Sequence, residues 1–187
     1  MSNFSLEKIS KETLHIARDI VNSNKRYNVL ENGREERTLK EMEEEFLNET
    51  TESFFIKGNN EYVGVLDYLV KNPNDQYPWL GLLMIHHDYQ EIGYGKKAYS
   101  LFEAEARKAG MQIVRLAVLT ENFSARTFWE SLGYKRYETK PYKEGKKVDC
   151  FEKVIKNKSA SALIIDVQTG GASTKDLGNT VSEANRC

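Results

Sequence analysis

WLGLLMIHHDYQEIGYG, residues 79–95, is the stretch of sequence that decides the fold. Its first half, Trp79–Ile85, is almost entirely apolar and has the length of one buried strand. Its second half, Gln90–Gly95, is a short loop with two glycines spaced G-x-G. The segment that follows has apolar residues at helical spacing, and Gly110 is placed to end that helix. The stretch therefore predicts a strand, a glycine loop and a helix in succession.

The glycine loop is predicted to bind an anion. A helix N-terminus has unpaired main-chain N–H groups and the positive end of the helix dipole. Gly93 and Gly95 have no Cβ, so the main chain can turn sharply and approach a ligand, while Lys96 and Lys97 add positive charge. A phosphate suits such a site. Taken alone, however, a G-x-G pair favours the simpler interpretation of a turn between a strand and a helix.

The run I-H-H-D-Y-Q-E-I-G-Y-G-K within this stretch resembles the coenzyme A signature of the GCN5-related N-acetyltransferase (GNAT) superfamily. In that family an apolar strand leads into a Gln/Arg-x-x-Gly-x-Gly loop on the pyrophosphate, and Gln90, Gly93 and Gly95 stand at those positions. His87 stands where many members have proline. Ala98 replaces the third glycine of a dinucleotide fingerprint, and the P-loop pattern is absent, so neither alternative motif fits.

A second block, Thr120–Tyr134, is predicted to form a short helix that Asn122 or Ser124 caps and Gly133 ends. It also resembles another GNAT hallmark, Asn-x-x-Ala followed by an aromatic residue and Leu-Gly-Phe/Tyr. In the family this asparagine hydrogen-bonds the pantetheine arm, which implies the same role for Asn122. The residues that match are Asn122, Ala125, Leu132, Gly133 and Tyr134.

Composition predicts an ordinary soluble globular domain. The chain has 187 residues, 40% of them hydrophobic and 29% charged, and its net charge is -1. That charge predicts no nucleic-acid or membrane partner, and the length suits a single domain. The two cysteines are too few for a disulfide framework, and no stretch could span a bilayer. The first residues lack a continuous apolar core, so no signal peptide is expected. A cytoplasmic protein is therefore expected.

The resemblance and the periodicity together predict one GNAT-like domain over residues 1–156. The expected fold class is α+β (mixed α/β): a mixed, mostly antiparallel sheet of six to seven strands, flanked by about four helices, with a splayed strand pair at the CoA site. Residues 22–37 are predicted to be a loop, and residues 157–187 a flexible C-terminal tail. Strands are predicted at 3–9, 52–57, 61–70, 79–85, 112–119, 134–138 and 147–155, and helices from Ser10, at 38–50, after the glycine loop, and from Asn122.

The resemblance implies direct transfer of an acetyl group from acetyl-CoA to a primary amine of a small molecule or protein. The main chain of the strand before the loop is expected to pair with the pantetheine, and the amides of the loop are expected to hold the pyrophosphate. The residues expected to contact acetyl-CoA are Leu83, Met84, Ile85, Gln90, Glu91, Ile92, Gly93, Tyr94, Gly95, Lys96 and Asn122.

The acid and the base of the reaction do not carry over from the resemblance. Many members have a tyrosine on the short helix that protonates the leaving thiolate, but Trp129 stands there, and an indole N–H is too weak an acid. The simpler interpretation of the adjacent histidines is an exposed edge of a loop. No spacing of His, Cys, Asp or Glu suggests a metal site. The candidates are Tyr134 or Tyr137 as the acid, and Asp67, His86, His87 or Asp88 as the base.

Two other functions stay open on the sequence alone. An acyl-CoA-binding module with little catalytic activity fits the missing tyrosine, and a nucleotide-binding protein could use the same glycine loop. The sequence names no acceptor amine, and it leaves open whether the protein is a monomer or a homodimer.

Overall fold

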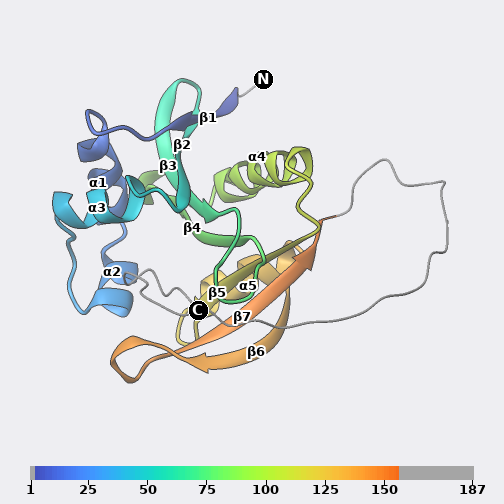
Figure 1. Cartoon of the computed structure of the whole chain (residues 1–187). Coiled ribbons are helices and arrows are strands. Elements are labelled where there is room, and N and C mark those ends of the chain that lie inside the picture. Colours follow the sequence, from blue (N-terminus) through green and yellow to red (C-terminus); the bar gives the residue numbers. More distant parts are fainter. Residues whose placement is uncertain (1–2, 156–187) are drawn as a thin grey trace.

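A computed structural model describes residues 3–155, which form a seven-stranded mixed sheet with helices on both faces (Figure 1). The strand order is β1-β2-β3-β4-β5-β7-β6, with β4 and β5 parallel and the other neighbours antiparallel. The predicted α+β class and mixed sheet are confirmed. The strands are β1 (Phe4–Lys8), β2 (Thr51–Gly58), β3 (Glu61–Leu69), β4 (Trp79–Ile85), β5 (Ile113–Leu119), β6 (Lys135–Pro141) and β7 (Lys147–Val154).

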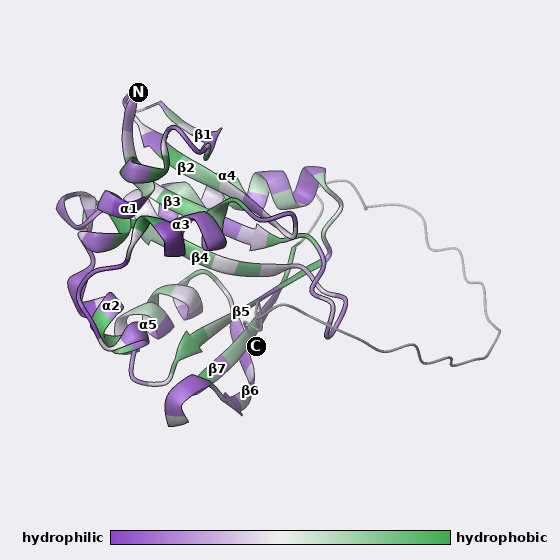
Figure 2. Cartoon of the chain, turned by 60° about the vertical axis from the view of Figure 1, so that its left-hand side comes forward, coloured by the Kyte–Doolittle hydropathy of each residue, from purple (hydrophilic) through white to green (hydrophobic). Residues whose placement is uncertain are grey.

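Five α-helices and two short 3-10 turns connect these strands in the described residues. On one face of the sheet, α1 and α3 cover β2, β3 and β4, and on the other face α4 and α5 pack over the sheet. Figure 2 shows hydrophobic residues on the strands and hydrophilic ones on the outer side of α3. The helices are α1 (Leu14–Asn22), α2 (Lys25–Asn32), α3 (Leu39–Phe46), α4 (Tyr94–Lys108) and α5 (Phe123–Ser131), with η1 (His87–Tyr89) and η2 (Lys143–Gly145) as the 3-10 turns.

Helix α2 lies where the sequence predicts a loop, and that prediction is wrong for residues 25–32. Its apolar stripe is weak, and Asn28 is the buried residue of the helix. The helix is held from outside instead, because Lys146 Nζ donates to the carbonyl of Glu31 at 2.9 Å and Lys143 Nζ donates to Asn32 Oδ1 at 3.1 Å. Both lysines lie at the negative end of the helix dipole, which they stabilise. Tertiary contacts, rather than helix propensity, therefore stabilise α2.

Two helix boundaries also differ from the prediction. Helix α1 begins at Leu14 rather than Ser10, because the residues between form a tight turn in which Thr13 N–H donates to the carbonyl of Ser10 at 3.2 Å. Helix α3 has a true capping box, in which Thr38 and Glu41 each bond the other's main-chain N–H, and it ends at Phe46. Over residues 3–155, every helix is too short or too polar to cross a bilayer.

Candidate functional site

The parallel strands β4 and β5 touch at one end only. Trp79 and Arg115, near the start of each strand, are the bridging pair, and Arg115 N–H donates to the carbonyl of Pro78 at 2.9 Å. The pairing of β3 with β4 skips Gly81, which is therefore a β-bulge that bends β4. Because no further pair follows in the described strands, β4 and β5 diverge toward Ile85 and Leu119. A gap with unpaired strand edges opens between them, as predicted for a splayed pair.

The start of α4 lies at the open end of this gap and carries free main-chain donors. The chain passes through positive φ at Glu91 (63°) and Gly93 (86°) before α4 begins. The first helical hydrogen bond runs from Lys97 N–H to the carbonyl of Gly93 at 3.3 Å. The N–H groups of Tyr94, Gly95 and Lys96 make no hydrogen bond within residues 3–155. Such a turn of amides at a helix N-terminus suits a phosphate group.

The two loop glycines have different roles. Gly93 has the left-handed conformation that disfavours a Cβ, with open space where a Cβ would stand. Gly95 is a packing position, since a Cβ there would lie 3.2 Å from Phe128 Cε2 of α5. The ring of Tyr94 meets Phe4 edge-on, with 4.9 Å between centroids, so its side chain serves packing. Lys96 is exposed beside these amides.

Gln90 anchors the loop to the strand before it. Its Nε2 donates to the carbonyl of Ile85 at 2.9 Å and to Asn24 Oδ1 at 2.6 Å. Asn24 Nδ2 also donates to the carbonyl of Ile85, at 3.1 Å, and Ser23 Oγ accepts from His87 N–H at 3.0 Å. The sequence interpretation missed Ser23 and Asn24, because two polar residues in an apparent loop give no local signal of a partner about 60 residues away.

Asn122 lies at the start of α5, directly after β5, and caps that helix. Its Oδ1 accepts hydrogen bonds from Ala125 N–H at 3.2 Å and from Ser124 Oγ at 3.1 Å. These bonds fix the orientation of the side chain, and its Nδ2 has no partner among the described residues. A fixed amide donor thus remains free beside the gap, which fits the amide-bearing pantetheine arm of CoA. Of the two caps predicted, Asn122 is the one found.

The candidate acid Tyr134 is a core residue. Its side chain is 2% exposed and packs against Trp129 and Tyr99, with ring centroids 5.4 Å and 5.9 Å away. Its hydroxyl lies 3.4 Å from the hydroxyl of Tyr99, and burial raises the pKa of the Tyr134 phenol far above its ordinary value. Tyr137 stacks on Arg115, near the start of β5 and away from the open end of the gap, and burial raises the pKa of its phenol too.

The candidate bases differ in their exposure to solvent. Asp67 of β3 is 2% exposed, and its Oδ1 accepts a hydrogen bond from Ser53 Oγ at 2.6 Å. His86 directly follows β4, and 27% of its side chain is exposed. Its Nδ1 accepts from Asp88 N–H at 3.2 Å and lies 3.9 Å from the Asp88 carboxylate. His87 and Asp88 are themselves exposed in η1. Three of the four candidates therefore have solvent access after β4, and His86 is the one that directly follows the strand.

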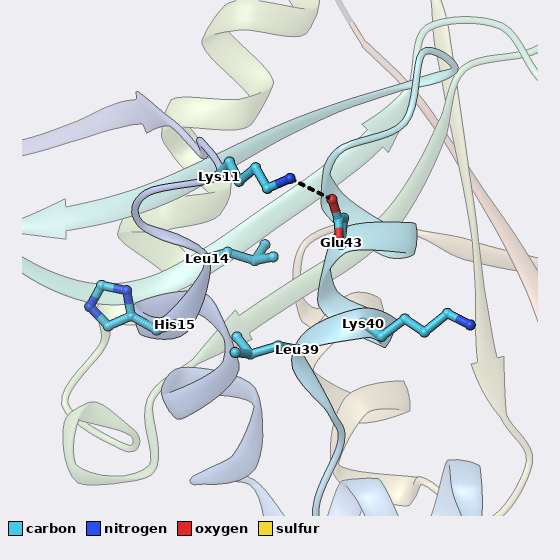
Figure 3. Close-up of a pocket in the computed structure, with 6 residues that line it drawn as sticks. All are labelled: Lys11, Leu14, His15, Leu39, Lys40 and Glu43. Carbon is cyan, nitrogen blue, oxygen red and sulfur yellow. Dashed lines mark ion pairs between the residues drawn. The ribbon is translucent and has the colours of Figure 1, made fainter.

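Two clefts lie beside α1 and α3, away from the gap between β4 and β5. The smaller encloses about 350 Å³, and its Lys11 and Glu43 form an ion pair of 3.5 Å (Figure 3). The larger encloses about 860 Å³ and contains Arg18, Arg34 and Arg37, each paired with a carboxylate within 3 Å.

Over residues 3–155, no three His, Cys, Asp or Glu side chains group as metal ligands.

Comparisons with solved structures show the same fold. An acetyltransferase from Thermus thermophilus is 21% identical, with a TM-score of 0.69 over 81% of this chain and 96% of that chain. The ribosomal-protein-S18-alanine N-acetyltransferase from Escherichia coli is 17% identical, with a TM-score of 0.65 over 87% and 100%. Spermidine N-acetyltransferase from Vibrio cholerae, in complex with CoA and spermine, is 13% identical, with a TM-score of 0.66 over 81% and 95%.

At the level of sequence, no curated protein matches the chain. The family described as "Acetyltransferase (GNAT) family" matches residues 17–134, which is more than half of the chain and includes the gap, the glycine loop and the α5 motif. The chain therefore belongs to the acetyltransferase (GNAT) family, whose members are acetyl-CoA-dependent enzymes.

Proposed function

We propose that this protein transfers an acetyl group from acetyl-CoA to a primary amine of a small molecule or a protein. The observation that carries the proposal is the gap between β4 and β5, with free amides of α4 at its open end and the free Nδ2 of Asn122 beside it. The pantetheine arm would lie along Leu83–Ile85, and the pyrophosphate would meet the N–H groups of residues 91–96.

In the proposed reaction the nitrogen of a neutral amine attacks the thioester carbonyl carbon, the carbon–sulfur bond breaks, and CoA leaves as the thiolate. The proton lost by the amine passes to a base. We assign that base to His86, directly or through water, because it directly follows β4, has solvent access and is held beside Asp88. On accepting a proton at Nδ1, the ring can exchange its bond from Asp88 N–H for one to the Asp88 carboxylate.

The second candidate function is an acyl-CoA-binding module with little catalytic activity. One observation favours it: Trp129 stands where many relatives have the acidic tyrosine, and Tyr134 lies in the core. Without a protein acid, release of CoA depends on the thiol group itself being a tolerable leaving group.

The test is release of free CoA thiol from acetyl-CoA in the presence of a panel of amines, with binding of acetyl-CoA measured by calorimetry on the same protein. The panel holds polyamines, aminoglycosides and peptides with a free N-terminus. Turnover with any amine supports the enzyme. Tight binding with no turnover on any amine selects the binding module, and absence of acetyl-CoA binding defeats both.

A further inference from the structure

The sheet consists of two halves that share very little main-chain contact. The first half is β1–β4 and the second is β5, β7 and β6. Among the described residues, the pair Trp79 and Arg115 alone bridges β4 and β5, with the Arg115 N–H bond to Pro78 beside it. Two halves joined by one pair at one end can rotate about that point unless side chains fix them.

The side chain of Arg115 binds one carboxylate from each half. Its Nη1 lies 3.0 Å from Asp75 Oδ2 in the connection between β3 and β4. On the other side, its Nε and Nη2 lie 3.2 Å and 3.0 Å from Glu152 Oε2 in β7. Asp75 is fixed in turn, because its Oδ2 accepts from Trp79 Nε1 at 2.8 Å. One guanidinium therefore ties the loop before β4 to the second half of the sheet.

The same guanidinium also stacks between two tyrosines, again one from each half. Its Cζ lies 3.9 Å from the ring centroid of Tyr77, which belongs to the loop before β4, and 4.8 Å from that of Tyr137 in β6. Tyr137 occupies the β-bulge where the pairing of β6 with β7 shifts, and the bulge lets its ring reach Arg115. A planar guanidinium can stack and bond in this way, whereas a lysine ammonium cannot.

This assembly is partly removed from water, with 18% of the Arg115 side chain and 24% of the Asp75 side chain exposed. Ion pairs with restricted access to solvent are screened less by water and salt than fully exposed pairs are. The assembly also lies at the closed end of the gap, about 20 Å along β4 from Ile85 at the strand rise of extended chain. A small rotation at Arg115 therefore produces a larger displacement at the open end.

We propose that Arg115 is a positioning residue that sets the separation of β4 and β5, and thereby the width of the gap for the pantetheine arm of acetyl-CoA. The inference rests on the proposed function, since it takes the gap as the acyl-CoA site. Arg115 lies outside that site and acts through the two strands.

The test compares two ligands on the Arg115→Ala and Arg115→Lys variants. Acetyl-CoA uses the whole gap, whereas 3′-phospho-ADP lacks the pantetheine arm and uses only the amides of α4. We expect Arg115→Ala to weaken acetyl-CoA binding about tenfold, the equivalent of one lost hydrogen bond to the arm, and 3′-phospho-ADP binding less than about twofold. Arg115→Lys should fall between the wild type and Arg115→Ala. Equal losses for both ligands, or no loss for acetyl-CoA in a folded variant, would overturn the proposal.

Arg136→Ala is the matched control. Arg136 is also an ion-paired arginine near these strands, but its partners Thr139 and Asp149 both belong to the second half of the sheet. It should leave both affinities unchanged. If Arg115→Ala fails to fold, Tyr77→Ala and Asp75→Asn each remove one link between the two halves, and each should show the same selective loss for acetyl-CoA.

A second readout needs no ligand and separates this inference from the proposed function. Spin labels on Ser5→Cys and Lys147→Cys, both exposed at the open ends of their halves, report the separation of the halves in a Cys187→Ser background. We expect a broader or longer distance distribution in Arg115→Ala than in Arg136→Ala. Identical distributions overturn the inference even if acetyl-CoA binds. A changed distribution supports Arg115 as the residue that sets the strand separation even if the wild type binds no acetyl-CoA, a result that would defeat the proposed function alone.

Discussion

The side-chain amide of Gln90 donates a hydrogen bond to the main-chain carbonyl of Ile85 at 2.9 Å and so fastens the glycine loop to the end of β4. Asn24, from the junction of α1 and α2, bonds both groups. Gln90, the glutamine of the family motif, thus holds the glycine loop in place through its bonds to Ile85 and Asn24.

The Gln90→Leu variant tests this support. Loss of the amide frees the loop and leaves Ile85 with fewer donors, so we expect acetyl-CoA to bind about tenfold more weakly. Calorimetry measures the affinity, and a urea titration checks that the fold is intact. Gln112→Leu is the control, because Gln112 is an exposed glutamine whose side chain makes no described hydrogen bond. Unchanged affinity in Gln90→Leu would contradict the role.

Gly93→Ala should cost both stability and affinity. Gly93 has φ of 86°, and a Cβ in that conformation costs about 1 to 2 kcal/mol. Gly110, at the other end of α4, has φ of 72° and equally open surroundings, so Gly110→Ala should cost a similar amount of stability. Only Gly93→Ala should weaken acetyl-CoA binding. Urea denaturation and calorimetry on both variants measure the two effects, and equal loss of affinity in both would show that the loop is not the binding element.

Local features of the fold could be predicted from the sequence, and long-range ones could not. The strand, glycine loop and α4 follow one another in sequence, so periodicity and two glycines suffice to predict them. Helix α2 escaped prediction because its stabilising partners, Lys143 and Lys146, lie more than 100 residues later. Arg115 is the charged residue in the otherwise apolar IVRLAVL, and such a residue needs partners from neighbouring elements, but the sequence does not indicate which ones.

The ion pair between Glu103 of α4 and Lys153 of β7 makes the stability of the fold depend on pH. Their charged atoms lie 2.7 Å apart, and the two side chains are 16% and 19% exposed. Burial opposes ionisation of Glu103, but the hydrogen bond and charge of Lys153, with help from Arg107, outweigh it and lower the pKa of Glu103 below 4.5. A carboxyl with a lowered folded pKa stabilises the fold above its unfolded pKa and loses that contribution as the pH falls.

Glu103→Gln should therefore lose about 1 to 3 kcal/mol of stability at neutral pH, the usual worth of a charged hydrogen bond. The difference from the wild type should shrink as the pH falls from the ordinary pKa of a glutamate through the lowered pKa of Glu103, where the folded protein takes up the proton. Urea denaturation at neutral pH and at acidic pH measures this difference in the free energy of unfolding. The exposed pair of Glu105 with Lys108 supplies the control, since Glu105→Gln should change little at either pH. A difference that stays constant with pH would show that packing, rather than charge, carries the effect.

His86→Gln and Asp67→Asn distinguish two of the four candidate bases. If His86 takes the proton, His86→Gln should lower kcat about a hundredfold and leave the KM for acetyl-CoA unchanged. Asp67→Asn should act chiefly on stability, because the buried carboxylate accepts the bond of 2.6 Å from Ser53. Steady-state kinetics with the best amine of the panel measures both variants. The opposite ranking of the two kcat values would assign the base to Asp67.

Tyr134→Phe tests whether the phenol in the core has any part in the reaction. Its hydroxyl makes a long bond of 3.4 Å to Tyr99, the residue is 2% exposed, and burial holds the pKa of the phenol high. A group that gives up its proton so reluctantly is a poor acid for a leaving thiolate. We therefore expect Tyr134→Phe to keep kcat within about twofold and to change stability by less than about 1 kcal/mol. Tyr99→Phe, which removes the other hydroxyl of the pair, should also keep kcat, but it also removes the bond from Lys153 Nζ at 3.2 Å and should cost more stability. A hundredfold fall in kcat for Tyr134→Phe alone would restore Tyr134 as the acid and require that the core around Trp129 opens during turnover.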